Sequence, residues 1–296
     1  MHENIPHIPV MVDEVITYLA PRPGGVYLDV TFGAGGHTRA ILDAEPSCSV
    51  IAMDWDTVSL ETHGLTLKEE FGDRLQLVWG NFALLYRVLK REKIKHIDGI
   101  LADFGTSQMQ IADRAGFSIY RDTPLDMRMS PSHQKTTAAD VIAFASEREL
   151  ADIFHHFGEE RYSRRIARAI VEERRKQPIL TTGRLASIVT HAMPGERGRI
   201  HPATRVFQAL RIYVNKELDN IQAFLTEAIR VLNPGGRLVC ISFHSLEDRL
   251  VKRFFKEKEL EGVLTVLTPK VVTASEHEVV RNASSRSACL RAAQVV

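Results

Sequence analysis

Apolar runs of strand length alternate with segments of helical periodicity through the first hundred residues. Three of the runs lead to an acid, namely Asp29, Asp54 and Asp103, and a further run covers 75–79. Helices are expected between them, at about 57–71 and 84–93. Strands that alternate with helices predict a parallel sheet wound by right-handed crossovers.

This alternation stops near residue 108. From Gln108 to Arg211 the chain has helical patterns and loops but no convincing strand. It resumes with a helix at 216–232, the breaker at 233–236 and a strand at 237–242. The pattern predicts an α/β domain interrupted by a helical block whose two ends meet at the C-terminal edge of the sheet. The predicted parts are 1–107, 108–211 and 212–296.

A glycine turn follows the first strand, in the run 27–37. Gly33, Gly35 and Gly36 lack a Cβ, as expected where backbone approaches a ligand closely. Asp54 follows about 20 residues later at the tip of the neighbouring strand, where a carboxylate can accept both hydroxyls of a ribose. The turn and the acid together predict an adenosine-containing cofactor.

Two classes of adenosine-containing cofactor bind at such a turn: nicotinamide or flavin dinucleotides, and S-adenosylmethionine. The glycine spacing favours the second class. A pyrophosphate usually takes Gly-x-Gly-x-x-Gly, but position 38 is Thr. Asp29 lies on the approach to the turn, where it would repel a pyrophosphate and attract a cationic sulfonium. S-adenosylmethionine is therefore preferred to a dinucleotide. On this short motif alone, a nicotinamide oxidoreductase and a ligand-free structural turn remain alternatives.

Asp103 is the candidate catalytic residue, because reacting groups lie beyond the carboxyl ends of parallel strands. Methyl transfer from a sulfonium requires that acceptor atom, methyl carbon and leaving sulfur be aligned. If the methyl acceptor is an exocyclic base amine, a hydrogen-bond acceptor beside it helps localise its lone pair, and Asp103 or a nearby backbone carbonyl could serve. The alternative role for Asp103 is a turn or helix cap. An extruded base could stack on an aromatic ring, and the candidates are Phe104, Phe117 and Phe243, for each of which core packing is the alternative.

Two further polar residues have open roles. Asp126 and His244 lie near predicted sheet edges or ends of the insertion, where each could touch substrate or serve as a structural hydrogen-bonding residue. No pair of histidines has metal-ligand spacing, so no metal site is predicted.

Charge is informative only locally. The 296 residues carry a net charge of +1, yet residues 161–211 contain twelve basic and three acidic residues, a net of +9. Arg161, Arg164, Arg165 and Arg168 fall mostly on one face of a predicted helix whose apolar positions lie on another. Such a face binds phosphates, and nucleic acid is preferred to a solvated helix paired with its own glutamates.

Composition sets the remaining expectations. With 44% hydrophobic and 25% charged residues, the chain can bury a sizeable core. Its three cysteines lie far apart and indicate reduced thiols rather than a disulfide framework or a zinc site. The N-terminus has no signal pattern and no stretch reaches the length of a membrane span, so a soluble cytoplasmic protein is expected.

The chain resembles the bacterial 16S ribosomal RNA cytosine-N4 methyltransferases of the MraW type, also called RsmH. The matching segments are 7–11, 31–37, 103–105, 116–118, 124–129, 198–205, 207–214, 241–252 and 286–288. The resemblance implies a Rossmann-like S-adenosylmethionine-dependent methyltransferase fold with an inserted helical substrate-recognition domain. It also implies N4-methylation of a cytidine in the decoding region (P site) of 16S rRNA.

The resemblance also implies site residues. Carried over by position, those that bind the cofactor are Gly35, Gly36, His37, Asp54, Phe82, Asp103 and Gln110. Where the family usually has Ser-Ser-Pro-Gln, this chain has Ser107-Gln108-Met109-Gln110, which makes Gln108 an alternative to Gln110. Thr123 stands where the family usually has glycine, in a loop near the acceptor.

The implied partner is 16S rRNA or the small ribosomal subunit. No interaction with a membrane is expected. Oligomeric state stays open, with a dimer as one option. A non-catalytic RNA-binding or ribosome-assembly factor that retains the fold is the third functional hypothesis, beside the methyltransferase and the oxidoreductase.

Overall fold

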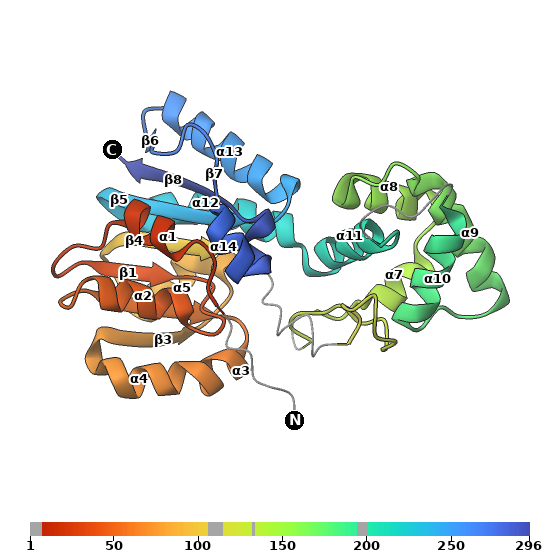
Figure 1. Ribbon diagram of the computed structural model, residues 1–296, viewed down its shortest axis with the longest axis horizontal. Coiled ribbons are helices and arrows are strands. Elements are labelled where there is room, and N and C mark those ends of the chain that lie inside the picture. The colour runs from red at the N-terminus through yellow and green to blue at the C-terminus, as the bar shows by residue number, and fades with distance from the viewer. Residues whose placement is uncertain (1–7, 106–114, 132–133, 194–200) are drawn as a thin grey trace. The chain divides into compact units, whose positions relative to one another are not determined.

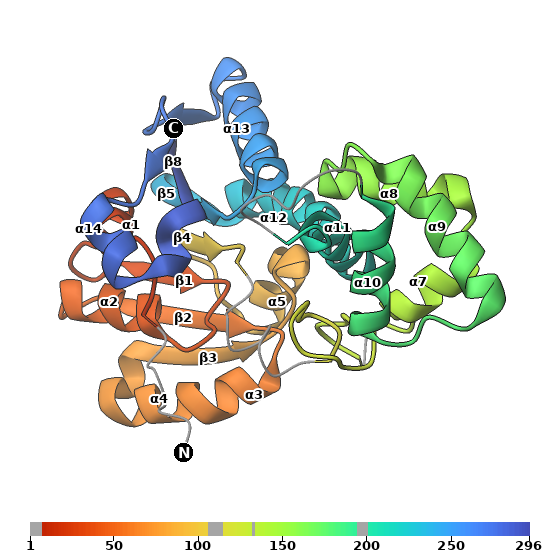
Figure 2. The same cartoon turned by 45° about the vertical axis from the view of Figure 1, so that its right-hand side comes forward.

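The computed structural model describes residues 8–105, 115–131, 134–193 and 201–296. By its internal contacts the chain divides into two compact units (Figure 1 and Figure 2). An α/β unit is built from Met1–Gly105 and Leu218–Val296, and a helical unit from Thr106–Glu217.

The α/β unit is built on one mixed sheet in the order β3-β2-β1-β4-β5-β8-β6, with β7 also paired to β8. Its strands are β1 (Val26–Asp29), β2 (Ser49–Asp54), β3 (Leu75–Trp79), β4 (Ile97–Asp103), β5 (Leu232–Ser242), β6 (Leu264–Val266), β7 (Val272–Thr273) and β8 (Cys289–Val295). Strands β1 to β5 are parallel, as predicted. The sheet continues beyond the predicted strands, because β8, which was not predicted, runs antiparallel to β5, β6 and β7.

The sequence of β8 explains why it was not predicted. Its centre carries Arg291, which breaks the apolar run although the residue is buried. The guanidinium is accommodated because it forms an ion pair with Asp248 of α13 (Ser245–Leu260), with Nε donating to Oδ1 at 2.6 Å. A polarity pattern therefore does not indicate this strand, because its buried charge is compensated only in the tertiary structure.

Helices cover both faces of the sheet. The remaining α-helices of this unit are α1 (Val12–Leu19), α2 (Gly36–Ala44), α3 (Thr57–Ser59), α4 (Leu65–Phe71), α5 (Leu85–Arg91), α12 (Glu217–Val231) and α14 (Glu276–Arg281). A π-turn at Leu60–Gly64 joins α3 to α4, so the predicted helix at 57–71 is confirmed; 3₁₀ turns lie at Gly72–Arg74, Phe82–Leu84 and Ala283–Ser287.

Alternation along the strands sorts side chains between two apolar layers. Leu28 belongs to the layer that includes α5, α12 and α13. Its neighbour Tyr27 belongs to the layer that includes α1, α2 and α4. With both faces covered, the carboxyl and amino ends of the parallel strands are the parts of the sheet left for a ligand.

The predicted breaker before the last parallel strand is a bulge inside β5. Leu232 is in register with Ile97, and Arg237 is in register with Gly99, so residues 233–236 stand opposite Asp98. Asn233 Nδ2 donates to Asp98 Oδ1 at 3.0 Å, which holds the bulge against β4.

The helical unit has its own apolar core. Its α-helices are α7 (Ala138–Phe144), α8 (Glu147–Gly158), α9 (Ser163–Lys176), α10 (Thr182–Ala192) and α11 (Thr204–Asn215). A Cβ on Gly158 would lie 2.5 Å from the Arg205 carbonyl oxygen, so glycine permits the close approach of α8 and α11. No strand is found among the described residues of 115–211, where β-pairing is limited to the bridge between Pro124 and Thr181.

The internal contacts place the end of the helical unit at Glu217, whereas the sequence suggested Arg211. A boundary at Arg211 would cut α11, whose Val214 is part of the helical core. The helix instead ends at Lys216, which has a left-handed backbone conformation with φ 52° although it is not a glycine.

Among the described helices, none combines the length and apolar composition needed to cross a bilayer.

Candidate active site

Three acids lie at the carboxyl ends of adjacent strands. Asp29 ends β1, Asp54 ends β2 and Asp103 ends β4, and β1 is paired with both of the other strands. Asp29 and Asp54 are 1% and 6% exposed, while the Asp103 side chain is 18% exposed. The topology therefore gathers three carboxyls at one edge of the sheet and leaves Asp103 the most accessible.

The glycine turn connects β1 to α2. Gly33 and Gly35 have φ of +54° and +80°, a region in which a side chain is strained. A Cβ on Gly33 would meet nothing closer than 3.8 Å, so this side of the turn is open. Gly36 differs, because its Cβ would lie 2.8 Å from Pro9 Cγ. The absence of a side chain at Gly36 is thus explained by packing within the protein.

Asp54 is held by the backbone on both of its oxygens. Gly33 N donates to Oδ2 at 2.8 Å, and Asp56 N donates to Oδ1 at 2.9 Å. Burial raises the pKa of Asp54 to about 6, although these two hydrogen bonds oppose the rise. Each carboxylate oxygen retains a further acceptor site. The side chain is therefore oriented and can still accept hydroxyl groups.

Thr31 links Asp29 to Asp103, and Thr38 also binds Asp29. Thr38 Oγ1 donates to Asp29 Oδ2 at 2.8 Å, and Thr31 N donates to Asp29 Oδ1 at 3.1 Å. Thr31 Oγ1 in turn accepts from Asp103 N at 2.7 Å. Thr38 occupies the place of the missing third glycine, so the residue that spoils the dinucleotide spacing is the one that fixes Asp29.

His37 lies between the N-terminal segment and Asp103. Its ring is buried, with Nε2 2.8 Å from Val10 O and Nδ1 3.9 Å from Asp103 Oδ2. Burial raises the pKa of Asp103 to about 6, and the nearby His37 lowers it again in part. Neither the Val10 contact nor the threonine links were predicted; the sequence signal for them was limited to the Thr at position 38.

Phe82 joins a cluster of aromatic rings beside this edge. Its centroid is 6.1 Å from that of Phe104 and 5.6 Å from that of Phe224, the latter edge to face. Asn81 Oδ1 accepts from Ala83 N and fixes the turn that carries Phe82. Phe82 and Phe104 are partly exposed, so an aromatic face remains for a planar ligand.

The other predicted aromatics have packing contacts. A Cβ on Gly105 would lie 2.4 Å from the Phe243 ring, so Phe243 packs against the backbone after β4. Phe117 packs on the core of the helical unit. Gln110 and its alternative Gln108 lie outside the described residues.

Asp126 and His244 have structural partners. Asp126 accepts two hydrogen bonds from the Arg128 guanidinium, at 2.7 and 2.8 Å, which lowers the pKa of the carboxyl. His244 caps α13 and forms a capping box with Glu247. Both residues therefore have a role in local structure, the alternative that the sequence had left open beside substrate contact.

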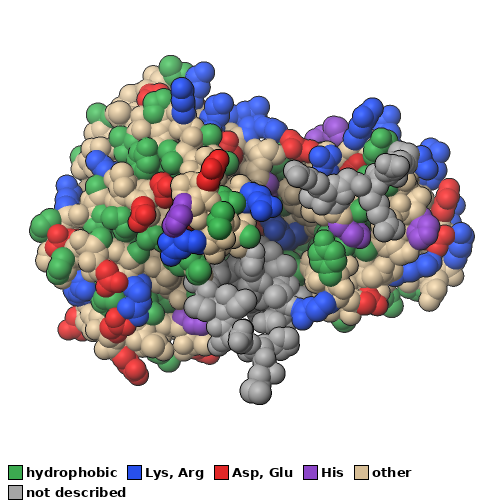
Figure 3. Space-filling model, viewed as in Figure 1, with side chains coloured by type: hydrophobic (Ala, Val, Ile, Leu, Met, Phe, Trp, Pro, Cys, Tyr) green, Lys and Arg blue, Asp and Glu red, His purple; other side chains and the backbone are tan. Residues whose placement is uncertain are grey.

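The bases of the helical unit fall into two groups. Several are engaged: Arg174 Nη1 donates to Ile142 O and Ala145 O, Arg211 pairs with Glu217, Lys176 and Arg184 pair with Glu173, Arg168 lies near Glu147, and Arg205 donates to Glu159 O. Arg164, Arg165 and Arg175 of α9 are exposed and pair with no acid in the described part of the chain. Lys and Arg side chains are frequent on the face of this unit drawn in Figure 3.

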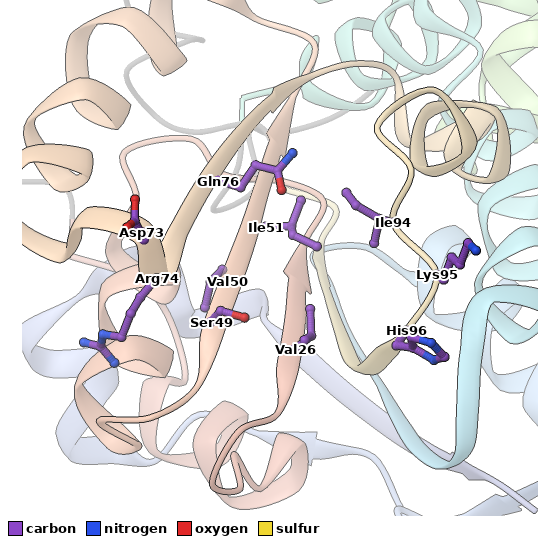
Figure 4. Close-up of a pocket in the computed structure, with 10 residues that line it drawn as sticks. All are labelled: Val26, Ser49, Val50, Ile51, Asp73, Arg74, Gln76, Ile94, Lys95 and His96. Atoms are coloured by element: carbon purple, nitrogen blue, oxygen red, sulfur yellow. The ribbon is translucent and has the colours of Figure 1, made fainter.

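A separate hollow of about 280 Å³ lies at the opposite end of the strands. Figure 4 shows its lining, which includes Val26 and Ser49, the first residues of β1 and β2. Arg74, which also lines it, donates to the carbonyls of Leu42 and Glu45. Since the three acids lie at the carboxyl ends, this hollow is not the candidate active site.

Nearly the full length of the chain matches a protein-family model and several known proteins. A family model described as the MraW methylase family matches residues 4–296. A ribosomal RNA small subunit methyltransferase H from Bradyrhizobium diazoefficiens is 49% identical over 307 residues, covering 98% of this chain and 92% of the relative. The protein of that name from Nitrobacter hamburgensis is 50% identical over 304 residues (97% and 90%), and that from Syntrophotalea carbinolica 46% over 309 residues (98% and 98%).

Proposed function

The chain belongs to the MraW methylase family, and on that premise we propose that it methylates the N4 amine of a cytidine in the decoding region (P site) of 16S rRNA. The predicted family resemblance is confirmed, and S-adenosylmethionine is the methyl donor. The observation that carries the proposal is the trio of carboxyls at the ends of β1, β2 and β4, beside an open glycine turn.

The residues at this edge fit the donor chemically. Asp54 has acceptor sites left for ribose hydroxyls, and Phe82 offers an aromatic face to adenine. Gly35, Gly36 and His37 lie at the start of α2, whose first amides suit the carboxylate of the methionine part. Asp29 and Asp103 provide negative charge for a cationic centre. Gln110, or Gln108 in its place, completes the proposed set.

Asp103 is the proposed catalytic residue. When bound, the donor supplies an electrophilic methyl group, and the amine nitrogen must attack it in line. As a carboxylate, Asp103 accepts a hydrogen bond from the amine and then takes the proton that the methylated nitrogen gives up. Its pKa of about 6 leaves it largely ionised above neutral pH. It is also the most exposed of the three acids.

The helical unit is the proposed RNA-binding part. Arg164, Arg165 and Arg175 of α9 are exposed and pair with no acid among the described residues, and such arginines suit phosphate binding. A folded rRNA presents closely spaced phosphates, which suits a basic module better than a small-molecule substrate does. We place the reaction in the cytoplasm, where bacterial ribosomal subunits are assembled.

Nucleoside mass spectrometry tests the proposed function. Purified protein is incubated with labelled S-adenosylmethionine and small subunits from cells that lack this gene, and the rRNA is then digested. We expect label in N4-methylcytidine at one position. Label in another nucleoside would overturn the assignment of the acceptor.

The same assay distinguishes the methyltransferase hypothesis from the assembly-factor hypothesis. Asp103→Ala should abolish the label, while subunit profiles in cells that express this variant report assembly. If the variant restores assembly but wild-type protein places no methyl on RNA, the protein is an assembly factor. Family membership decides against the nicotinamide oxidoreductase.

A further inference from the structure

Helix α13 of the α/β unit carries a group of exposed basic side chains on one face. Lys252, Arg253 and Lys256 fall within an arc of about 100° around the helix axis, and we call them the α13 stripe. The other side of the helix is apolar, because Val251 and Phe255 are buried in the core of this unit. Lys and Arg side chains gather over the part of the α/β unit where α13 lies (Figure 1 and Figure 3).

The acids of α13 do not neutralise this stripe. Each of them has a partner elsewhere: Glu247 accepts from Phe243 N, Asp248 pairs with Arg291, Glu257 pairs with Lys258, and Glu259 accepts from Val266 N. The α13 stripe pairs with no acid among the residues that the structure describes. Cations that are neighbours on one helix face repel one another, and a bound anion relieves that repulsion. The stripe therefore offers three uncompensated positive charges to an anionic partner.

The helix that carries the stripe starts beside the candidate active site. Ile241 of β5 is in register with Asp103 of β4, and α13 begins four residues after Ile241. At the rise of an α-helix, the stripe lies roughly 10 to 17 Å along α13 from its first residue. A nucleic acid strand carries a negative charge at every nucleotide. A strand that brings one base to Asp103 therefore has phosphates of neighbouring nucleotides within reach of the stripe.

We propose that the α13 stripe binds the phosphate backbone of the RNA beside the target nucleotide, as an RNA-binding surface on the unit that carries Asp103. This inference rests on the proposed function, because that function supplies the RNA. A basic helix can also bind an anionic membrane, but it then inserts its apolar face into the lipid. The apolar face of α13 is packed in the core, where Phe255 is 2% exposed. RNA is therefore the partner that matches the stripe.

Contacts to phosphates position an RNA without taking part in the chemistry. Loss of the stripe should therefore raise the KM for small ribosomal subunits and leave kcat at saturating subunits unchanged. The affinity for S-adenosylmethionine should also stay the same, because the three side chains lie on the solvent face of α13.

Salt-dependent binding provides the test. The stripe variant combines Lys252→Gln, Arg253→Gln and Lys256→Gln. Its affinity for small subunits that lack the modification is measured from about 50 to about 200 mM salt, beside that of wild type. We expect the slope of log affinity against log salt to decrease by about 2 to 2.7 if all three side chains contact phosphates.

A matched control removes the same charge at the other end of the strands. Lys90, Lys93 and Lys95 are exposed and lie at the end of α5 and in the turn that leads to β4. The control variant combines Lys90→Gln, Lys93→Gln and Lys95→Gln, and its salt slope should equal that of wild type. An equal decrease in both variants would assign the effect to net charge alone and overturn the proposal.

Two further outcomes would also overturn it. One is an unchanged salt slope in the stripe variant. The other is loss of binding to phosphatidylglycerol vesicles, relative to wild type, with no loss of RNA affinity. The result is separable from the proposed function, because binding is measured without methylation. If wild-type protein places no methyl on cytidine, the proposed function fails, whereas a reduced salt slope in the stripe variant alone would still support this surface.

Discussion

The two units differ in where their functional charges lie and in how these charges are held. In the α/β unit, Asp29 and Asp54 are buried, and backbone or threonine donors fix both of them. In the helical unit, Arg164 and Arg165 are exposed and have no acidic partner among the described residues. A small cofactor needs few charges in fixed positions, whereas a polyanion needs many charges that can adapt. Buried and oriented charges are therefore typical of a small-ligand pocket, and exposed charges without fixed partners are typical of a polyanion-binding surface.

The largest effect that tests this comparison is expected at Asp103. Asp103→Asn keeps the size of the side chain and the acceptor for Gly105 N but removes the charge. Methyl transfer should fall by about 10²- to 10⁴-fold, as for loss of a proton acceptor. Single-turnover rates with saturating cofactor measure this, and Asp43→Asn is the exposed control. A loss of less than about fivefold would mean that Asp103 is not the proton acceptor.

The same substitution should change stability in the opposite direction. Burial raises the pKa of Asp103 from 3.8 to about 6, so the folded state disfavours the carboxylate. Stability is then highest below the unfolded pKa and falls as pH rises through about 6. Without cofactor, Asp103→Asn should stabilise the protein at pH 8 by up to about 3 kcal/mol and have little effect at pH 4. Urea denaturation at both pH values decides this, and equal effects at both would contradict it.

The sequence predicted the acids of the candidate site but not the long-range contacts that surround them. Asp54 follows from a strand, a glycine turn and a spacing of about 20 residues, all of which are local features. The contact of His37 with Val10 joins residues 27 positions apart, and that of Met11 with Glu278 joins residues 267 apart. No periodicity records such contacts, because they depend on how the chain ends are folded back onto the sheet.

The arginines show the same limit. Counting charge gave +9 for residues 161–211, and α9 does present exposed arginines. Arg174 is nevertheless bound to carbonyls of residues 29 and 32 positions away, and nothing in its neighbourhood in the sequence sets it apart from Arg175. A charge count thus predicts a basic surface but not which of its members hold the fold together.

Arg174 and Arg175 are adjacent and allow a matched test of that division. The Arg174 guanidinium donates to Ile142 O and Ala145 O at the end of α7, at 2.6 and 2.7 Å. Arg174→Ala should therefore lower the free energy of unfolding by about 1–3 kcal/mol. Arg175→Ala should change it by less than about 0.5 kcal/mol, since this residue is exposed. Equal losses in chemical denaturation would remove the distinction.

The smallest effect is expected at the exposed arginines, and it should appear in binding alone. Replacing Arg164 and Arg165 by Ala removes two cations that have no acidic partner among the described residues, so unfolding should change little. If these side chains bind phosphates, the slope of log affinity for rRNA against log salt should decrease by about 1.4 to 1.8. Affinity at moderate salt should fall severalfold, while cofactor affinity stays the same. An unchanged salt slope would show that α9 faces solvent in the complex, and the RNA surface would then have to be sought elsewhere on the helical unit.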